Sequence, residues 1–129
     1  MSGSVLLDTN IVIGLFAGDS CILSHLSERD SIFIPSIVLG ELYFGAYKSA
    51  RPDDNVRRID EFLLASAILS CDATTAAHYG KIKKILCERG RPLPENDIWI
   101  AALARQHNLS VVSRDRHFKE IEGLSIETW

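Results

Sequence analysis

The sequence predicts an α/β fold of three layers, α/β/α, in which helices cover both faces of a parallel sheet of four to five strands. Two observations lead to this prediction. Short apolar segments alternate along the chain with longer segments in which apolar residues recur at helical spacing. The short segments are apolar almost throughout, which is typical of strands that are buried on both faces, and their alternation with helices indicates parallel pairing.

The first strand is expected over residues 4–8 (SVLLD), where a short apolar run ends on an aspartate. Residues 10–17 are expected to form a short helix. Asp19 or Ser20 is a suitable N-cap for a second helix that extends to about residue 29, because a side-chain oxygen at this position accepts a hydrogen bond from the first helical turn.

The second strand is expected over residues 31–34 (SIFI). It should end at Pro35, because proline has no N–H group with which to continue the pairing. Ser36 is a good N-cap, so a helix is predicted over residues 37–49.

Pro52 is expected to break the helix of residues 37–49, after which Asp53 or Asp54 could cap the next helix. One face of that helix is marked by apolar residues at helical spacing, namely Val56, Ile59, Phe62 and Leu63. Residues 67–71 (AILSC) are predicted as the third strand.

Asp72 is expected to cap a long helix that ends at Gly90, since glycine readily adopts the left-handed conformation that follows a helix. Another helix is predicted over residues 95–107. Residues 109–113 (LSVVS) are predicted as the fourth strand, and residues 124–126 as a short fifth.

The length and composition fit one domain over residues 1–129. The chain is 47% hydrophobic and 24% charged, and it contains no internal repeat, low-complexity segment or linker. A domain of this length buries enough surface to fold without disulfides or a structural metal.

The net charge of −3 does not indicate a protein that binds nucleic acid through phosphate contacts alone, although bound cations could change the local field. Positive charge is concentrated in residues 81–91, where five of eleven residues are Lys or Arg. A solvated helix face is the simpler interpretation of this segment, and contact with RNA is the alternative.

The three cysteines, Cys21, Cys71 and Cys87, are odd in number and far apart. They predict buried thiols in a reducing cytosol rather than a disulfide framework or a zinc site. The N-terminus does not resemble a signal peptide, and no apolar run approaches the ~20 residues of a membrane span. We therefore expect a cytoplasmic protein without a membrane partner.

Four acidic residues occupy positions where packing would favour apolar ones: Asp8, Glu41, Asp97 and Asp115. Asp8 and Asp115 come at the carboxyl ends of predicted strands, where the sites of parallel sheets form. Glu41 and Asp97 share their helix faces with apolar or small neighbours, so both are expected to project inward.

Each of these acids has a simpler interpretation when it is taken alone. Asp8 could cap the helix that follows it, as could Thr9 or Asn10. Asp97 could be a first-turn carboxylate that favours the helix dipole. Asp115 lies between two arginines and could be an exposed turn residue or half of a surface ion pair.

Taken together, the four acids predict a metal site. Two carboxylates about 5 Å apart repel each other by about 3 kcal/mol at an effective dielectric of ~20, so a cluster of them requires protons or cations. Carboxylates and water are the ligands of Mg²⁺ and Mn²⁺, and such a site suits phosphoryl chemistry. The four histidines show no catalytic pairing, and no P-loop, GxSxG, HExxH or GxGxxG motif is present.

The segments "LLDTN", "PENDIWIAALA" and "VVSRDRHF", together with Glu41 in the helix after the second strand, resemble the PIN domain. More narrowly, they are similar to the VapC-type toxins of toxin–antitoxin pairs. The resemblance extends from Val5 to about Leu124. It implies a PIN-like fold with the strand order 3-2-1-4-5, which places the first and fourth strands side by side.

The resemblance implies an endoribonuclease dependent on Mg²⁺ or Mn²⁺. Its acidic quartet corresponds to Asp8, Glu41, Asp97 and Asp115. Asp8, Asp97 and Asp115 would bind the metal, and Glu41 would bind it through water or orient the attacking water. Thr9, Asn10 and Ser113 fall where the family often has polar residues that line the site, so they are expected to have supporting roles.

The resemblance also implies an RNA substrate, a homodimer and a cognate antitoxin protein. DNA would be bound only indirectly, through the antitoxin. The apolar faces of residues 10–29 and 54–64 are candidate surfaces for these contacts. The main alternative function is a catalytically idle PIN-like module that binds RNA or serves as a scaffold. A phosphatase of the HAD type would need a second aspartate at the position of Asn10, and a receiver domain would need an acidic neighbour beside Asp8.

Overall fold

The computed structural model describes residues 3–129. Its sheet has five parallel strands in the order β3-β2-β1-β4-β5, which confirms the predicted fold class and strand order. The strands are β1 (Ser4–Leu7), β2 (Ser31–Pro35), β3 (Ala67–Leu69), β4 (Ser110–Val112) and β5 (Ile126–Glu127).

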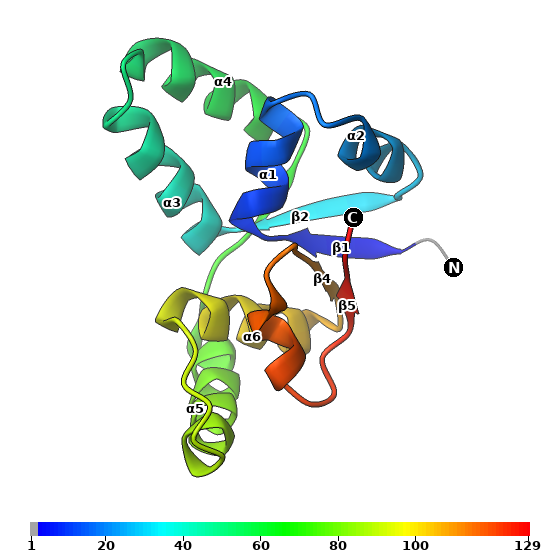
Figure 1. Cartoon of the computed structure of the whole chain (residues 1–129), viewed down its shortest axis with the longest axis vertical. Helices are drawn as coiled ribbons and strands as arrows, with labels where there is room; N and C mark the ends of the chain where they lie inside the picture. The colour runs from blue at the N-terminus through cyan, green and yellow to red at the C-terminus, as the bar shows by residue number, and fades with distance from the viewer. Residues whose placement is uncertain (1–2) are drawn as a thin grey trace.

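Helices cover both faces of the sheet (Figure 1). On one face lie α1 (Thr9–Phe16), α2 (Ser20–Ser27), α3 (Ser36–Tyr47) and α4 (Pro52–Leu64). On the other face lie α5 (Ala73–Glu88), α6 (Glu95–His107) and the 3₁₀ helix η1 (Arg116–Glu120). This is the expected three-layer architecture, and it buries apolar residues from every layer.

The central strand β1 sets the position of the functional edge. Leu6 pairs with Phe33 of β2 on one side and with Val111 of β4 on the other. Leu6 and Leu7 are fully buried. The backbone N–H of Asp8 donates to the carbonyl of Val112 at 3.0 Å, so the ends of β1 and β4 are held side by side at the strand-order switch.

Several predicted element boundaries are confirmed and others are wrong. Asp19 caps α2, Asp72 forms a capping box with Thr75, and Gly90 follows α5 with a φ of +64°. Ser36 does not cap α3, because the helix begins there with Pro35 as its N-cap residue. Asp53 and Asp54 do not cap α4, because that helix begins at Pro52 with Arg51 as its N-cap residue, which fits the fixed φ of proline at a first helical position.

The fifth strand lies over residues 126–127 rather than 124–126, and β3 ends at residue 69 rather than 71. Both differences follow from pairing. Residues 67–69 are opposite residues 33–35 of β2, and the partner strand ends there. Residues 126–127 are opposite residues 111–112 of β4, so the register of β4 determines where β5 forms.

The prediction that the cysteines are buried is wrong. Cys21, Cys71 and Cys87 are exposed and free. In the two helical cases the adjacent residue fills the core instead. Ile22 is fully buried beside Cys21, and Leu86 is 2% exposed beside Cys87, so each cysteine points to solvent.

Positive charges in residues 81–91 are largely paired with acids. Lys83 bonds Glu95, and Lys84 bonds Glu88 on the same helix. Arg89 and Arg91 reach Glu122 and Glu120. The simpler interpretation of this segment, a solvated face with surface ion pairs, is therefore favoured over a dedicated contact with RNA.

Among residues 3–129, no single helix is long and apolar enough to cross a membrane. The helices α1 and α2, whose axes meet at 108°, reach the required length and apolar composition only when the bent pair is taken together.

Candidate active site

Asp8 and Ser113 lie together at the carboxyl edge of the sheet, one after β1 and the other after β4. Both are buried, with exposed fractions of 5% and 1%. The hydroxyl of Ser113 donates to Oδ2 of Asp8 at 2.6 Å. The same hydroxyl accepts a hydrogen bond from the backbone N–H of Asp115 at 2.9 Å, so it links two of the four predicted acids.

Asp8 also caps α1, as its simpler interpretation proposed. Its Oδ1 accepts a hydrogen bond from the backbone N–H of Thr9 at 2.8 Å. The amide of Asn10 donates to Asp8 Oδ2 and to the hydroxyl of Ser113, both at 3.2 Å. Its carbonyl oxygen accepts from the backbone N–H of Arg114 at 3.1 Å. Asn10 thus joins the start of α1 to the loop after β4.

Asp97 lies in the first turn of α6 and is 9% exposed. Pro94 is the N-cap residue of this helix, so Asp97 is a first-turn carboxylate and does not itself cap it. Its neighbours Ile98 and Ile100 are buried in the core, which holds the start of the helix against the sheet. Asp97 therefore projects inward, as its sequence position predicted.

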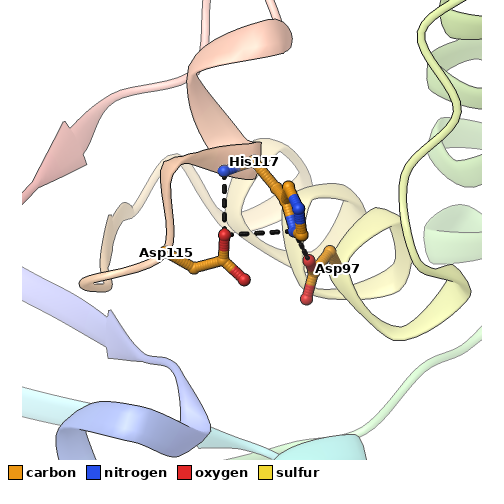
Figure 2. A group of neighbouring side chains, drawn as sticks. All are labelled: Asp97, Asp115 and His117. Atoms are coloured by element: carbon orange, nitrogen blue, oxygen red, sulfur yellow. Dashed lines mark hydrogen bonds and ion pairs between the residues drawn. The ribbon is translucent and has the colours of Figure 1, made fainter.

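Asp115, Asp97 and His117 form one group, which Figure 2 shows. Asp115 caps η1 by accepting the backbone N–H of His117 at 2.9 Å. The Nδ1 atom of His117 lies 3.0 Å from Oδ1 of Asp115 and 3.2 Å from Oδ2 of Asp97. The histidine ring thus bridges a carboxylate from the loop after β4 and a carboxylate from α6.

The prediction that the histidines show no catalytic pairing is wrong, because His117 contacts both Asp97 and Asp115. A usable signal was present in the segment "SRDRHF". An aspartate that caps a 3₁₀ turn bonds the N–H two residues later, and the side chain of that later residue then lies near the cap. The sequence could have indicated Asp115 beside His117, but the third member, Asp97, comes from a different element.

Glu41 is placed differently from the prediction. It is exposed on α3 rather than packed inward, although the hydroxyl of Thr9 donates to its Oε1 at 2.8 Å. The physical reason is that this part of α3 borders an open groove shared with α1 and α4, which Glu41 lines together with Leu42 and Gly45. Glu41 stands at the rim of the site.

Electrostatics link all four acids. Burial raises the pKa of Asp8, and the charges of Glu41 and Asp115 raise it further, while hydrogen bonds from Ser113 and Thr9 oppose the shift. Burial also raises the pKa of Asp97 to about 6, with smaller contributions from Asp8 and Asp115 and opposition from His117. A raised carboxylate pKa means that the site disfavours its own negative charge.

The donor set fits a divalent cation. Asp97, Asp115 and His117 each offer a ligand atom, and these atoms lie within 4.8 Å of one another. Asp8 adds negative charge to the same region, as its effect on the pKa of Asp97 demonstrates. A cation at this point would offset the repulsion between the carboxylates, which adds to the effect of burial on both pKa values. The assignment of Asp8, Asp97 and Asp115 as metal ligands remains a prediction.

Comparisons with known proteins extend over almost the whole chain. The PIN domain family matches residues 5–124. "Ribonuclease VapC2" of Haemophilus influenzae is 40% identical over 127 residues, and the alignment covers 96% of each chain. "tRNA(fMet)-specific endonuclease VapC" of Shigella flexneri is 34% identical over 127 residues, again with 96% of each chain covered.

Solved structures give the same result. The toxin–antitoxin complex VapBC2 of Rickettsia felis, bound to a DNA fragment from its promoter, contains a chain with a TM-score of 0.91 and 30% identity, and 98% of each chain is covered. A chain of DNA-bound VapBC from Salmonella typhimurium has a TM-score of 0.89 and 32% identity, with 100% of this chain and 99% of that chain covered. From its sequence match, its fold and its acidic sheet edge, this chain belongs to the PIN-domain family.

Proposed function

We propose that this chain is, as a single domain, a metal-dependent endoribonuclease that acts as the toxin of a type II toxin–antitoxin pair. The observation that carries the proposal is the meeting of Asp8, Asp97 and Asp115 at the carboxyl edge of β1 and β4, with Glu41 at the rim. Relatives that carry the name ribonuclease and align over 96% of the chain support it.

In this proposal Asp97, Asp115 and Asp8 hold Mg²⁺ or Mn²⁺. A cation held there would lower the pKa of a water molecule and offset negative charge on the phosphate under attack. The protein keeps these carboxylates in place without the cation. Ser113 and Asn10 fix the rotamer of Asp8 through its Oδ2, and the backbone N–H of His117 fixes Asp115.

Glu41 is suited to orient the attacking water, because it is exposed at the rim and its second carboxylate oxygen is available to accept a proton or a hydrogen bond. Thr9 holds the first oxygen at 2.8 Å. Water then attacks phosphorus, the bond from phosphorus to the 3′ oxygen breaks, and the 3′ oxygen takes up a proton. The products are RNA pieces with 5′-phosphate and 3′-hydroxyl ends.

The partner implied by the relatives is an antitoxin protein, through which DNA would be bound. A groove between α1, α3 and α4 offers it a surface with an apolar floor and a charged rim. Its lining residues are Ile13, Phe16, Glu41, Leu42, Gly45, Ala46, Asn55, Arg58 and Ile59. Because Glu41 belongs to this lining, a chain segment bound here would reach the rim of the active site.

The test is cleavage of RNA by the purified chain, freed of antitoxin, with Mg²⁺, Mn²⁺ or EDTA. The substrates are total RNA and, because of the Shigella relative, initiator tRNA. Asp97→Asn should lower the cleavage rate by at least roughly 10–100-fold. Mutation of a residue that only hydrogen-bonds a metal ligand typically costs that much, and Asp97 is proposed as a ligand itself. Glu88→Gln, which removes an exposed acid paired with Lys84, should cleave like the wild type.

Two results would overturn the proposal. One is equal cleavage by wild type and Asp97→Asn, and the other is RNA binding by the wild type without cleavage in either cation. The second result would favour the idle RNA-binding module.

A further inference from the structure

We propose that His117 is a nitrogen ligand of the active-site cation and that it makes the site prefer Mn²⁺ to Mg²⁺. The inference rests on the proposed function only in that a cation occupies this edge of the sheet. It goes further in assigning a ligand outside the acidic quartet and in stating which ion the site prefers.

The position of the ring is fixed by the backbone around it. The N–H of His117 donates to Asp115 Oδ1, and the N–H of Asp115 donates to the hydroxyl of Ser113. The next residue, Phe118, is fully buried and anchors η1 in the core. His117 therefore presents its Nδ1 atom from a short, tethered turn rather than from a free loop.

The distances around Nδ1 match those around an octahedral ion. Neighbouring ligands at about 2.1 Å from such an ion are about 3.0 Å apart. Nδ1 lies 3.0 Å from Asp115 Oδ1 and 3.2 Å from Asp97 Oδ2 (Figure 2). Nδ1 thus lies at the spacing of a neighbouring ligand from a carboxylate of each of two separate elements, and the three donor atoms lie within 4.8 Å of one another.

A hydrogen bond explains only part of this arrangement. Nδ1 carries at most one hydrogen, and that hydrogen can point well at one of the two carboxylates but not at both. A cation placed among the three atoms would satisfy all of them, with the neutral Nδ1 as its donor.

The nitrogen decides the choice of ion. Mg²⁺ is a hard ion that prefers oxygen ligands and retains much of its water, whereas imidazole suits the first-row transition ions. Mn²⁺ shares the preference of Mg²⁺ for carboxylate and water, but as a first-row transition ion it binds an imidazole nitrogen more readily than Mg²⁺ does. Two carboxylates with one imidazole therefore favour Mn²⁺ over Mg²⁺.

The direct test is the electron spin-echo signal of Mn²⁺ bound to the wild-type chain without RNA. A coordinated imidazole nitrogen produces ¹⁴N modulation of this signal, which oxygen ligands do not. We expect the modulation in the wild type and in His107→Asn, a control at an exposed histidine of α6. We expect its loss in His117→Asn, whose amide can still hydrogen-bond the carboxylates.

Affinities give the second readout. In His117→Asn the dissociation constant for Mn²⁺, measured from the free-ion resonance signal, should rise roughly 10-fold or more. The constant for Mg²⁺, measured by competition, should change less than about 3-fold, because Mg²⁺ gains little from imidazole. Bound Mn²⁺ without ¹⁴N modulation in the wild type would overturn the inference, and so would equal losses for both ions.

The nuclease proposal and the His117 proposal can be disproved independently of each other. If the wild type cleaves RNA but its bound Mn²⁺ shows no nitrogen, His117 is not a ligand and the nuclease assignment stands. If Mn²⁺ binds with the nitrogen signal but no RNA is cut, the inference stands and the nuclease assignment fails. Because the wild-type signal alone decides the first point, the test holds even if a variant does not fold.

Discussion

The hydroxyl of Ser113 donates a 2.6 Å hydrogen bond to the carboxylate of Asp8, and both side chains are almost fully buried. This bond joins the ends of β1 and β4 at the strand-order switch. It also accounts for the aspartate that ends an apolar strand. Asp8 is held by a hydroxyl, an amide and a helical N–H group, yet burial still raises its pKa.

Ser113→Ala tests how far this bond stabilises the protein. It removes a donor to a buried carboxylate, so we expect a loss of roughly 1–3 kcal/mol in the free energy of unfolding at pH 7.5, measured by urea denaturation. The matched control is Ser110→Ala at the other end of β4, which removes only an exposed hydroxyl pair with Ser125. A similar loss in both variants would mean that the bond to Asp8 contributes nothing particular.

The second prediction concerns pH. The pKa of Asp97 is about 6 in the folded chain and 3.8 in its reference state, so the folded state binds more protons between these values. The metal-free wild type should therefore lose stability relative to Asp97→Asn as the pH rises from about 4 to 7. A shift of this size corresponds to a change on the order of 2–3 kcal/mol.

The measurement is the difference in unfolding free energy between wild type and Asp97→Asn at several pH values in EDTA. Only the slope of that difference with pH is diagnostic, because the substitution can also change contacts that do not titrate. A flat difference between pH 4 and 7 would contradict the placement of Asp97 in a buried acidic site. With EDTA replaced by Mn²⁺, the wild type should gain more stability than Asp97→Asn, because each gains RT ln(1 + [Mn²⁺]/Kd) and the variant has the larger Kd.

The sequence predicts the residues of this site whose positions follow from strand topology or from an apolar helix face. It does not predict those whose positions depend on contacts between distant elements. Asp8 and Asp115 were predictable, because strands that run parallel bring their carboxyl ends to one edge. Asp97 was predictable from the apolar face around it. Glu41 was not, since the same pattern on α3 borders a groove rather than the core. His117 was missed because its partner Asp97 comes from another element, twenty positions away in sequence.

The third prediction concerns the groove between α1, α3 and α4. Gly45 lines it and Gly40 does not, and a Cβ added at either glycine would meet no atom within 4 Å. Gly45→Leu should therefore fold and partly fill the groove, weakening binding of a cognate antitoxin by at least about 10-fold.

Gly40→Leu on the same helix is the control, and it should bind the antitoxin within about 2-fold of the wild type. Calorimetric titration measures both affinities, and RNA cleavage by each free variant verifies that the active site is intact. Wild-type affinity in Gly45→Leu would place the antitoxin elsewhere.

The last prediction concerns the crossing of α1 over α2. A Cβ added at Gly14 of α1 would lie 2.5 Å from Cδ1 of Ile22, a side chain that is fully buried in α2. Overpacking of this kind typically costs 1–3 kcal/mol, and the helix preference of alanine offsets roughly 0.5–1 kcal/mol of it, so Gly14→Ala should lower the free energy of unfolding by roughly 0.5–2 kcal/mol. Gly40→Ala, at an exposed position of α3, should instead raise the free energy of unfolding by roughly 0.5–1 kcal/mol, because alanine favours the helical conformation.

Thermal and urea unfolding compare the two variants directly. Opposite signs are expected because the backbone conformation is helical at both positions and only the space beyond the Cβ differs. Equal gains in both variants would show that α1 and α2 do not pack this closely.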